Sequence, residues 1–141
     1  MSSNIYSQNG EDGIIDFLIS HLSTQNKYVI EIGAADGIQN NSSWLVVVHQ
    51  YRGLMIDGNP VLVQRAKQTI QSYSIGAEYV GMIVDRKSGN RIKDICPYSD
   101  PDVLSIDIDG IDYYVLIIRR YFVLLHSLIQ KSKCQKKLNL L

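Results

Sequence analysis

Short apolar runs alternate with amphipathic stretches along this chain, and the alternation predicts its secondary structure. Four runs have the length and composition of strands: residues 28–32, 54–56, 77–84 and 103–108. In the first run Tyr28, Val29, Ile30 and Ile32 are apolar on both sides of the chain, which is typical of a strand covered on both faces.

Helices are expected between these strands. Residues 11–22 place Ile14, Ile15, Leu18 and Leu22 at helical spacing, with acids in the first turn. A second helix is expected from about residue 41, capped by Asn41 or Ser42, with Trp44, Leu45 and Val48 facing inward. Asn59 and Pro60 predict the start of a third helix that ends near residue 72. Residues 85–101 are rich in turn formers and are expected to form a loop, with at most one short element at residues 92–95.

Strands that alternate with helices indicate an α/β fold with right-handed crossovers. We therefore expect a Rossmann-like, doubly wound and mostly parallel sheet of about four strands. The chain has 141 residues, enough for one domain with a core, and its 45% hydrophobic and 20% charged content is that of a globular protein.

Charge is segregated, although the formal net charge is +0. Residues 1–112 hold all 14 acids and eight of the 14 Lys and Arg residues, a balance of −6, and residues 113–141 hold the other six bases without an acid. We interpret this basic tail as a solvated end. No aromatic stacking platform accompanies it, so no nucleic-acid partner is expected.

The remaining bulk features indicate a cytoplasmic protein. Cys96 and Cys134 form no disulfide framework and no metal-ligand spacing, so free thiols in a reducing compartment are expected. The first residues are polar and acidic, unlike a signal peptide, and no apolar run is long enough to span a membrane.

The most informative segment is residues 28–37, YVIEIGAADG. A buried strand ends near Glu31, and Gly33 and Gly37 bracket a tight bend before the next helix. Such a bend allows close approach of a ligand, and we expect its free N–H groups to point outward. Asp57 ends the second strand, 20 residues after Gly37, where an acid can accept both hydroxyls of a ribose. The alternative is an ordinary turn that uses its glycines for geometry only.

The kind of nucleotide follows from what the bend contains. The dinucleotide fingerprint G-x-G-x-x-G is replaced by G-A-A-D-G, and Asp36 adds negative charge where a pyrophosphate would lie. This argues against NAD and favours an adenosine ligand without phosphates. S-adenosylmethionine fits, because its amino and sulfonium groups are cationic.

Five motifs carry a family resemblance: YSQNGEDGI at residues 6–14, EIGAADG at 31–37, GIQNNSSWL at 37–45, IDG at 56–58 and PDVLSIDIDGIDYYV at 101–115. Together they resemble the FkbM-type family of class I S-adenosylmethionine-dependent methyltransferases over about residues 5–116. The resemblance implies O-methylation of a sugar or other small hydroxyl acceptor, and a strand order of three-two-one-four. It implies a cofactor site at these residues: Glu31, Gly33, Ala34, Asp36, Gly37 and Asp57. It also suggests that Gln8 and Glu11 fold over the cofactor.

The C-terminal part departs from this family. A complete class I methyltransferase sheet has seven strands, but only 33 residues follow Ile108. We expect a truncated version of the fold, with a methyltransferase-like domain over residues 1–116 and a helix and basic tail over residues 117–141. Strand 103–108 would then lie at an open edge, through which the chain should form a homodimer or aggregate. The C-terminal helix is a second candidate for that dimer contact.

An acid cluster, S-I-D-I-D-G-I-D, follows the fourth strand. We expect Asp109 to be the base that takes the acceptor's proton and Asp107 to line the cofactor pocket. Asp112 could equally cap the next helix, and Asp85 could meet an adenine amino group or cap a loop. A rival interpretation is a glycosyltransferase, in which Asp107 and Asp109 hold a divalent cation against a nucleotide sugar. A catalytically inactive binding or assembly module is the other alternative.

Overall fold

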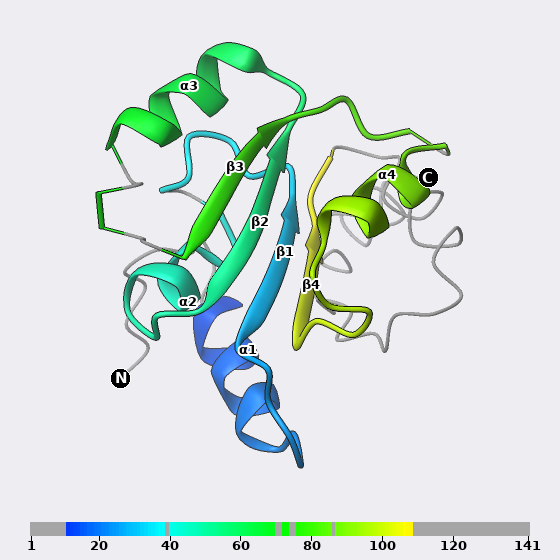
Figure 1. The fold of residues 1–141 in the computed structure, drawn as a ribbon. Coiled ribbons are helices and arrows are strands. Elements are labelled where there is room, and N and C mark those ends of the chain that lie inside the picture. Colours follow the sequence, from blue (N-terminus) through cyan, green and yellow to red (C-terminus); the bar gives the residue numbers. More distant parts are fainter. Residues whose placement is uncertain (1–10, 39, 70–71, 74–75, 86, 109–141) are drawn as a thin grey trace, which may run out of the picture.

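Four parallel strands form one sheet in the order β3-β2-β1-β4 (Figure 1). The computed structural model describes residues 11–38, 40–69, 72–73, 76–85 and 87–108. The strands are β1 (Tyr28–Ile32), β2 (Arg52–Asp57), β3 (Ala77–Gly81) and β4 (Val103–Ile106). The predicted α/β class and strand order are confirmed, and the sheet with its flanking helices is Rossmann-like.

Helices cover both faces of the sheet. They are α1 (Glu11–Ser20), α2 (Ser43–Val47), α3 (Pro60–Thr69) and α4 (Ser88–Ile95). One core cluster joins residues of α1, α2 and α3 to alternate strand residues such as Val29 and Met55. The other cluster joins Ile92 of α4 to the residues of opposite orientation, such as Ile30 and Leu54. Since successive side chains of a strand point to opposite faces, each strand supplies both clusters.

The parallel register brings the carboxyl ends of the strands to one edge. Ile32 is opposite Ile56 on β2 and Ile106 on β4. Glu31, one residue earlier, is opposite Met55 and Ser105. Among the described residues, β4 is hydrogen-bonded to β1 alone, so β4 and β3 are the two edge strands of the described sheet.

The third and fourth strands are shorter than predicted. β3 ends at Gly81 rather than at residue 84. The segment that follows makes a turn and leads into α4. In that turn the Ser88 hydroxyl accepts from the Asp85 N–H (2.9 Å) and donates to the Asp85 carboxylate (2.8 Å). β4 ends at Ile106, although the Asp107 N–H still donates to the Ile32 carbonyl (2.8 Å).

The helices differ from the prediction in length and phase. α4 has eight residues and includes the short element expected at residues 92–95, but it begins at Ser88, in the segment expected to be a loop. Ile92 is buried in the core and anchors this helix. The helices α1, α2 and α3 lie within the segments where helices were predicted. In α2 the buried residues include Val46, whereas Val48, which was expected to face inward, is 57% exposed. In α1 the core-facing residues are Ile15 and Ile19, and Ile14 is exposed.

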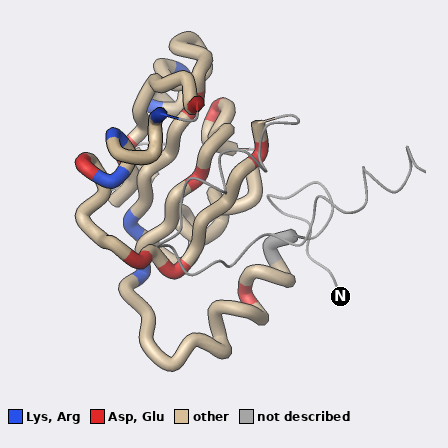
Figure 2. Tube along the Cα trace, turned by 90° about the vertical axis from the view of Figure 1, so that its right-hand side faces the viewer, with Lys and Arg blue, Asp and Glu red and all other residues tan. Residues whose placement is uncertain are grey.

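Acidic and basic residues are interspersed over the described chain (Figure 2). Among the helices that the structure describes, none combines the length and apolarity needed to cross a membrane. The basic tail, Cys134 and the predicted C-terminal helix lie outside the described residues, and the predicted division at residue 116 is therefore untested.

Candidate functional site

A small pocket lies at the carboxyl edge of the sheet. Its volume is about 190 Å³, and it is lined by the ends of β1 and β2 and by the segments that follow β3 and β4. The lining residues are Ile32, Gly33, Ile56, Asp57, Gly58, Met82, Ile83, Val84 and Ile108. Eight of these nine are apolar or glycine, so Asp57 is the one ionisable side chain of this lining. Carboxyl edges of parallel sheets are where α/β proteins bind ligands.

The two glycines of the bend after β1 are required by close contacts within the protein. Gly33 has φ +90°, and a Cβ there would overlap the carbonyl oxygen of Asp107 and lie 2.8 Å from its carbon. Gly37 has φ +78°, and a Cβ there would lie 2.9 Å from the ring of Tyr79. Glycine adopts these left-handed conformations without steric cost, and it leaves room for the neighbouring strands. The bend therefore packs at one end against the residue that follows β4 and at the other end against β3.

Four of the five amides of this bend, residues 33–37, donate hydrogen bonds within the chain, contrary to the expectation from sequence. The Gly33 and Ala34 N–H groups both donate to the Ile56 carbonyl, at 2.8 and 2.9 Å. The Gly37 N–H donates to the Ala34 carbonyl (3.0 Å), and the Ala35 N–H donates to Asp57. The register places the β2 carbonyl directly below the bend, so the chain satisfies its own donors. These amides do not form a phosphate cradle.

Asp57 joins the ends of β1 and β2 beside the pocket. Its Oδ2 accepts from the Ala35 N–H (2.8 Å) and its Oδ1 from the Asn59 N–H (2.7 Å). The residue is half-buried, and each carboxylate oxygen has a second lone pair. The carboxylate can therefore hold the bend and accept two further hydrogen bonds at the same time.

Glu31 is completely buried below the bend. Its Oε2 accepts from the Ser42 hydroxyl (2.5 Å) and its Oε1 from the Ser105 hydroxyl (3.0 Å). The amide of the Asn41 side chain donates in turn to the Ser105 hydroxyl (3.3 Å). Burial raises the pKa of Glu31 to about 8, and repulsion by Asp107 adds to the rise, against the effect of the two hydroxyls.

Asn40 organises the segment between the bend and α2. Its Oδ1 accepts from the Ser42 and Ser43 N–H groups (3.1 and 2.8 Å), and its Nδ2 donates to the Ala34 carbonyl (2.9 Å). Of the two predicted caps, Asn41 and Ser42, the structure confirms the position of Ser42. Ser42 occupies the N-cap position, but its hydroxyl binds Glu31 instead of a helix amide.

Three residues of this network, Asn40, Ser42 and Ser105, were missed as site residues by sequence reasoning. The signal for Ser105 was a single polar residue inside the apolar strand VLSI, level with the acid in strand YVIEI. Two polar residues in adjacent buried strands favour a hydrogen bond between them, because an unpaired polar group in a core is costly.

The other predicted acids lie around this centre. Asp36 is half-buried, and its Oδ1 accepts from the Ile38 N–H (3.1 Å). Asp107 is exposed, and its backbone packs against Gly33. Asp85 is exposed after β3, and hydrogen bonds from Ser88 and the Lys87 N–H hold its pKa below the usual range. The structure thus brings Glu31, Gly33, Ala34, Asp57 and Asp107 together, and it gives Asp85 a role in the turn before α4.

The catalytic prediction lies outside the described residues. Asp109, Asp112 and Gln8 belong to segments that the structure does not describe, and Glu11 is described only in its backbone. Over the described ranges, no group of three or more His, Cys, Asp or Glu residues is arranged to hold a metal ion.

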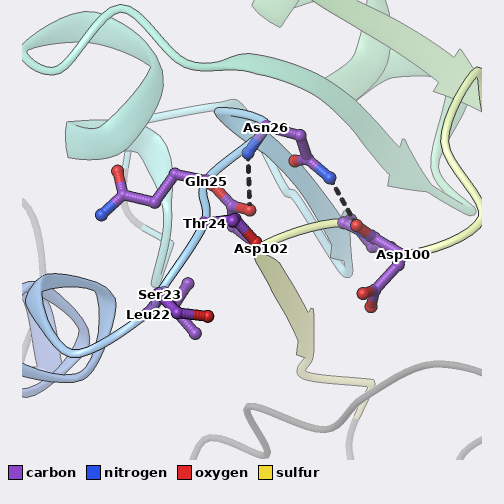
Figure 3. Close-up of a pocket in the computed structure, with 8 residues that line it drawn as sticks. Leu22, Ser23, Thr24, Gln25, Asn26, Asp100 and Asp102 are labelled. Carbon is purple, nitrogen blue, oxygen red and sulfur yellow. Dashed lines mark hydrogen bonds between the residues drawn. The ribbon is translucent and has the colours of Figure 1, made fainter.

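A larger hollow, of about 310 Å³, lies at the opposite edge of the sheet (Figure 3). The Asp102 carboxylate there accepts from the backbone N–H groups of Asn26 and Lys27, both at 2.9 Å. The Asn26 side chain donates to the Asp100 carbonyl (2.5 Å) and accepts from the Tyr28 N–H (3.0 Å). These groups tie the start of β1 to the start of β4, and the bonds account for this polar cluster as a structural clamp. We therefore favour the carboxyl edge as the ligand site.

A scan against models of protein families matches none to this chain, and a search of curated proteins finds no significant relative.

Proposed function

We propose that this protein binds S-adenosylmethionine at the carboxyl edge of its sheet. The carrying observation is Asp57 at the rim of an otherwise apolar pocket that Gly58 and Ile83 help to line. An adenosine group needs both features, because its ring is flat and largely apolar and its ribose carries two hydroxyls. The remaining lone pairs of the Asp57 carboxylate suit those hydroxyls.

The charges and donors around the pocket favour a ligand without phosphates. Among the described residues that line it there is no Lys or Arg, and the Gly33, Ala34, Ala35 and Gly37 amides donate hydrogen bonds within the chain. A diphosphate would therefore lack the cations and N–H groups that such sites use. This supports S-adenosylmethionine over NAD, and also over the nucleotide sugar of a glycosyltransferase. Acids such as Asp36 suit the cationic groups of S-adenosylmethionine.

The proposed activity is transfer of the methyl group to a hydroxyl of a sugar or other small acceptor. Transfer needs in-line placement of the acceptor oxygen and a base for its proton. The backbone of Asp107 adjoins Gly33, so the residues that follow it start at the same edge of the sheet. We assign the base to Asp109 on this placement along the chain.

We also propose that the protein is cytoplasmic and that it forms a homodimer through the outer edge of β4. Sedimentation of the full chain would test the homodimer.

Calorimetry with S-adenosylmethionine, S-adenosylhomocysteine and a UDP-sugar, titrated side by side, tests the ligand. We expect binding of the first two, and Asp57→Ala should weaken it about 5- to 150-fold, equivalent to about 1–3 kcal/mol. Asp94→Ala is the matched control, because Asp94 is an exposed acid on α4 away from the pocket lining. Circular dichroism should verify that each variant is folded.

Two outcomes would overturn the assignment. The folded chain could bind neither adenosyl ligand at millimolar concentration, or Asp57→Ala could bind them as tightly as the wild type does. Binding of the UDP-sugar that depends on Mn²⁺ and is lost with a chelator would support the glycosyltransferase alternative.

A further inference from the structure

Glu31 is an acid in the interior of the sheet, with an exposed fraction of 0%. Its neighbours across the strands are Met55 on β2 and Ser105 on β4. The hydrogen-bond partners of its carboxyl group among the described residues are the hydroxyls of Ser42 and Ser105 and the backbone of Asn41, all of them uncharged. Glu31 is therefore a buried acid held by neutral donors.

An ionised carboxylate is costly in such a place. A buried charge needs a cation or several strong donors to offset its loss of hydration, and otherwise the group becomes neutral. Among the described residues, Asp107 is the ionisable neighbour that acts on Glu31, and its negative charge opposes ionisation. Met55 on β2 and the residues of segment 40–42 contribute no ionisable side chain. The raised pKa of Glu31, about 8, agrees with this geometry.

The same carboxyl group connects three parts of the chain. Glu31 belongs to β1, Ser42 follows the glycine bend, and Ser105 belongs to β4. The neutral acid can keep both contacts, because it can donate its own proton to one hydroxyl while it accepts from the other. The contacts thus fix both ends of the bend relative to the sheet without any ligand.

We infer that Glu31 is a positioning residue whose neutral carboxyl group fixes the glycine bend, and that rising pH destabilises this arrangement by ionising the carboxyl group. Glu31 acts through its contacts with Ser42 and Ser105. The inference concerns the unliganded protein and does not depend on the identity of the ligand proposed above.

The direction of the pH dependence follows from proton linkage. The pKa of Glu31 is about 8 in the folded chain, against an ordinary value of 4.5. Between these values the folded state binds more protons than the unfolded state does, so stability falls as pH rises. The contribution is fully present below the ordinary pKa and is lost by the time pH has passed the folded value.

The test combines a titration with urea unfolding of the full chain. The carboxyl carbon of Glu31 is followed by NMR, assigned through its bonded correlations to the backbone, and checked by its absence in Glu31→Gln. We expect it to titrate near pH 8. We also expect that the unfolding equilibrium constant of the wild type will rise relative to that of Glu31→Gln by at least about tenfold between about pH 5 and about pH 9.

Glu78→Gln serves as the control, because Glu78 is an exposed acid on β3, and its unfolding should follow the wild type at every pH. Ser105→Ala removes a hydroxyl that stabilises the ionised form, so it should move the Glu31 titration to higher pH. If Glu31→Gln does not fold, the titration in the wild type and in Ser105→Ala decides. A carboxyl carbon that titrates near its ordinary value, or parallel pH profiles for wild type and Glu31→Gln, would overturn the inference.

Discussion

Replacing Gly33 with alanine should remove a large fraction of this protein's free energy of unfolding, because the added methyl group meets backbone atoms rather than a flexible side chain. The Cβ would overlap the Asp107 carbonyl oxygen and lie 3.3 Å from the Ile108 side chain. Asp107 would have to move, although its N–H is bonded to the Ile32 carbonyl (2.8 Å).

Three costs contribute to the expected loss. The left-handed conformation at φ +90° costs an alanine about 1–2 kcal/mol. Loss of the Asp107–Ile32 hydrogen bond costs about 1 kcal/mol. Overpacking against the end of β4 costs about 1–3 kcal/mol. We expect Gly33→Ala to lower the free energy of unfolding by about 3–6 kcal/mol, which is comparable to the whole stability of a small domain.

Urea unfolding followed by circular dichroism measures this loss. Gly81→Ala is the matched control, because a Cβ at Gly81 meets no atom within 4 Å. Its unfolding free energy should stay within about 1 kcal/mol of the wild-type value. If Gly33→Ala unfolded at the same urea concentration as Gly81→Ala, the close contact between the bend and the end of β4 would be refuted.

Two further predictions concern Asn40 and the base. Asn40→Ala should lower the free energy of unfolding by about 1–3 kcal/mol, because it removes the acceptor of the Ser42 and Ser43 N–H groups and the donor to Ala34; unfolding at wild-type urea concentrations would contradict this role. Asp109→Asn should greatly reduce methyl transfer and leave affinity for S-adenosylmethionine nearly unchanged, because a base acts on the acceptor; transfer assays and calorimetry on the same preparation measure both, and wild-type transfer rates would remove Asp109 from that role.

Local pattern was sufficient to predict much of the architecture. The apolar run Tyr28–Ile32 has the same first and last residues as β1, and Asn59 and Pro60 mark the start of α3. These features depend on side-chain type and spacing over a few residues, which the sequence shows directly. The strand order came from the family resemblance, and the structure confirms it.

Contacts between distant segments could not be predicted in the same way. Ser105 reaches Glu31 across 74 residues, and that pairing depends on the register of β4 against β1. The bend amides were expected to face a ligand, yet the register of β2 places the Ile56 carbonyl where it accepts two of them. Likewise, Ile92 of α4 is buried in a cluster with residues of the strands, which come from elsewhere in the chain.

The sequence by itself therefore determined which residues form the bend and that an acid lies near the end of each of the first two strands. The tertiary structure alone decided their surroundings: Asp57 lies half-buried at the rim of a pocket, and Glu31 is enclosed between two hydroxyls. The physical reason is that side-chain type is local, whereas burial and hydrogen-bond partners are set by strand register and by the segments that pack from elsewhere in the chain.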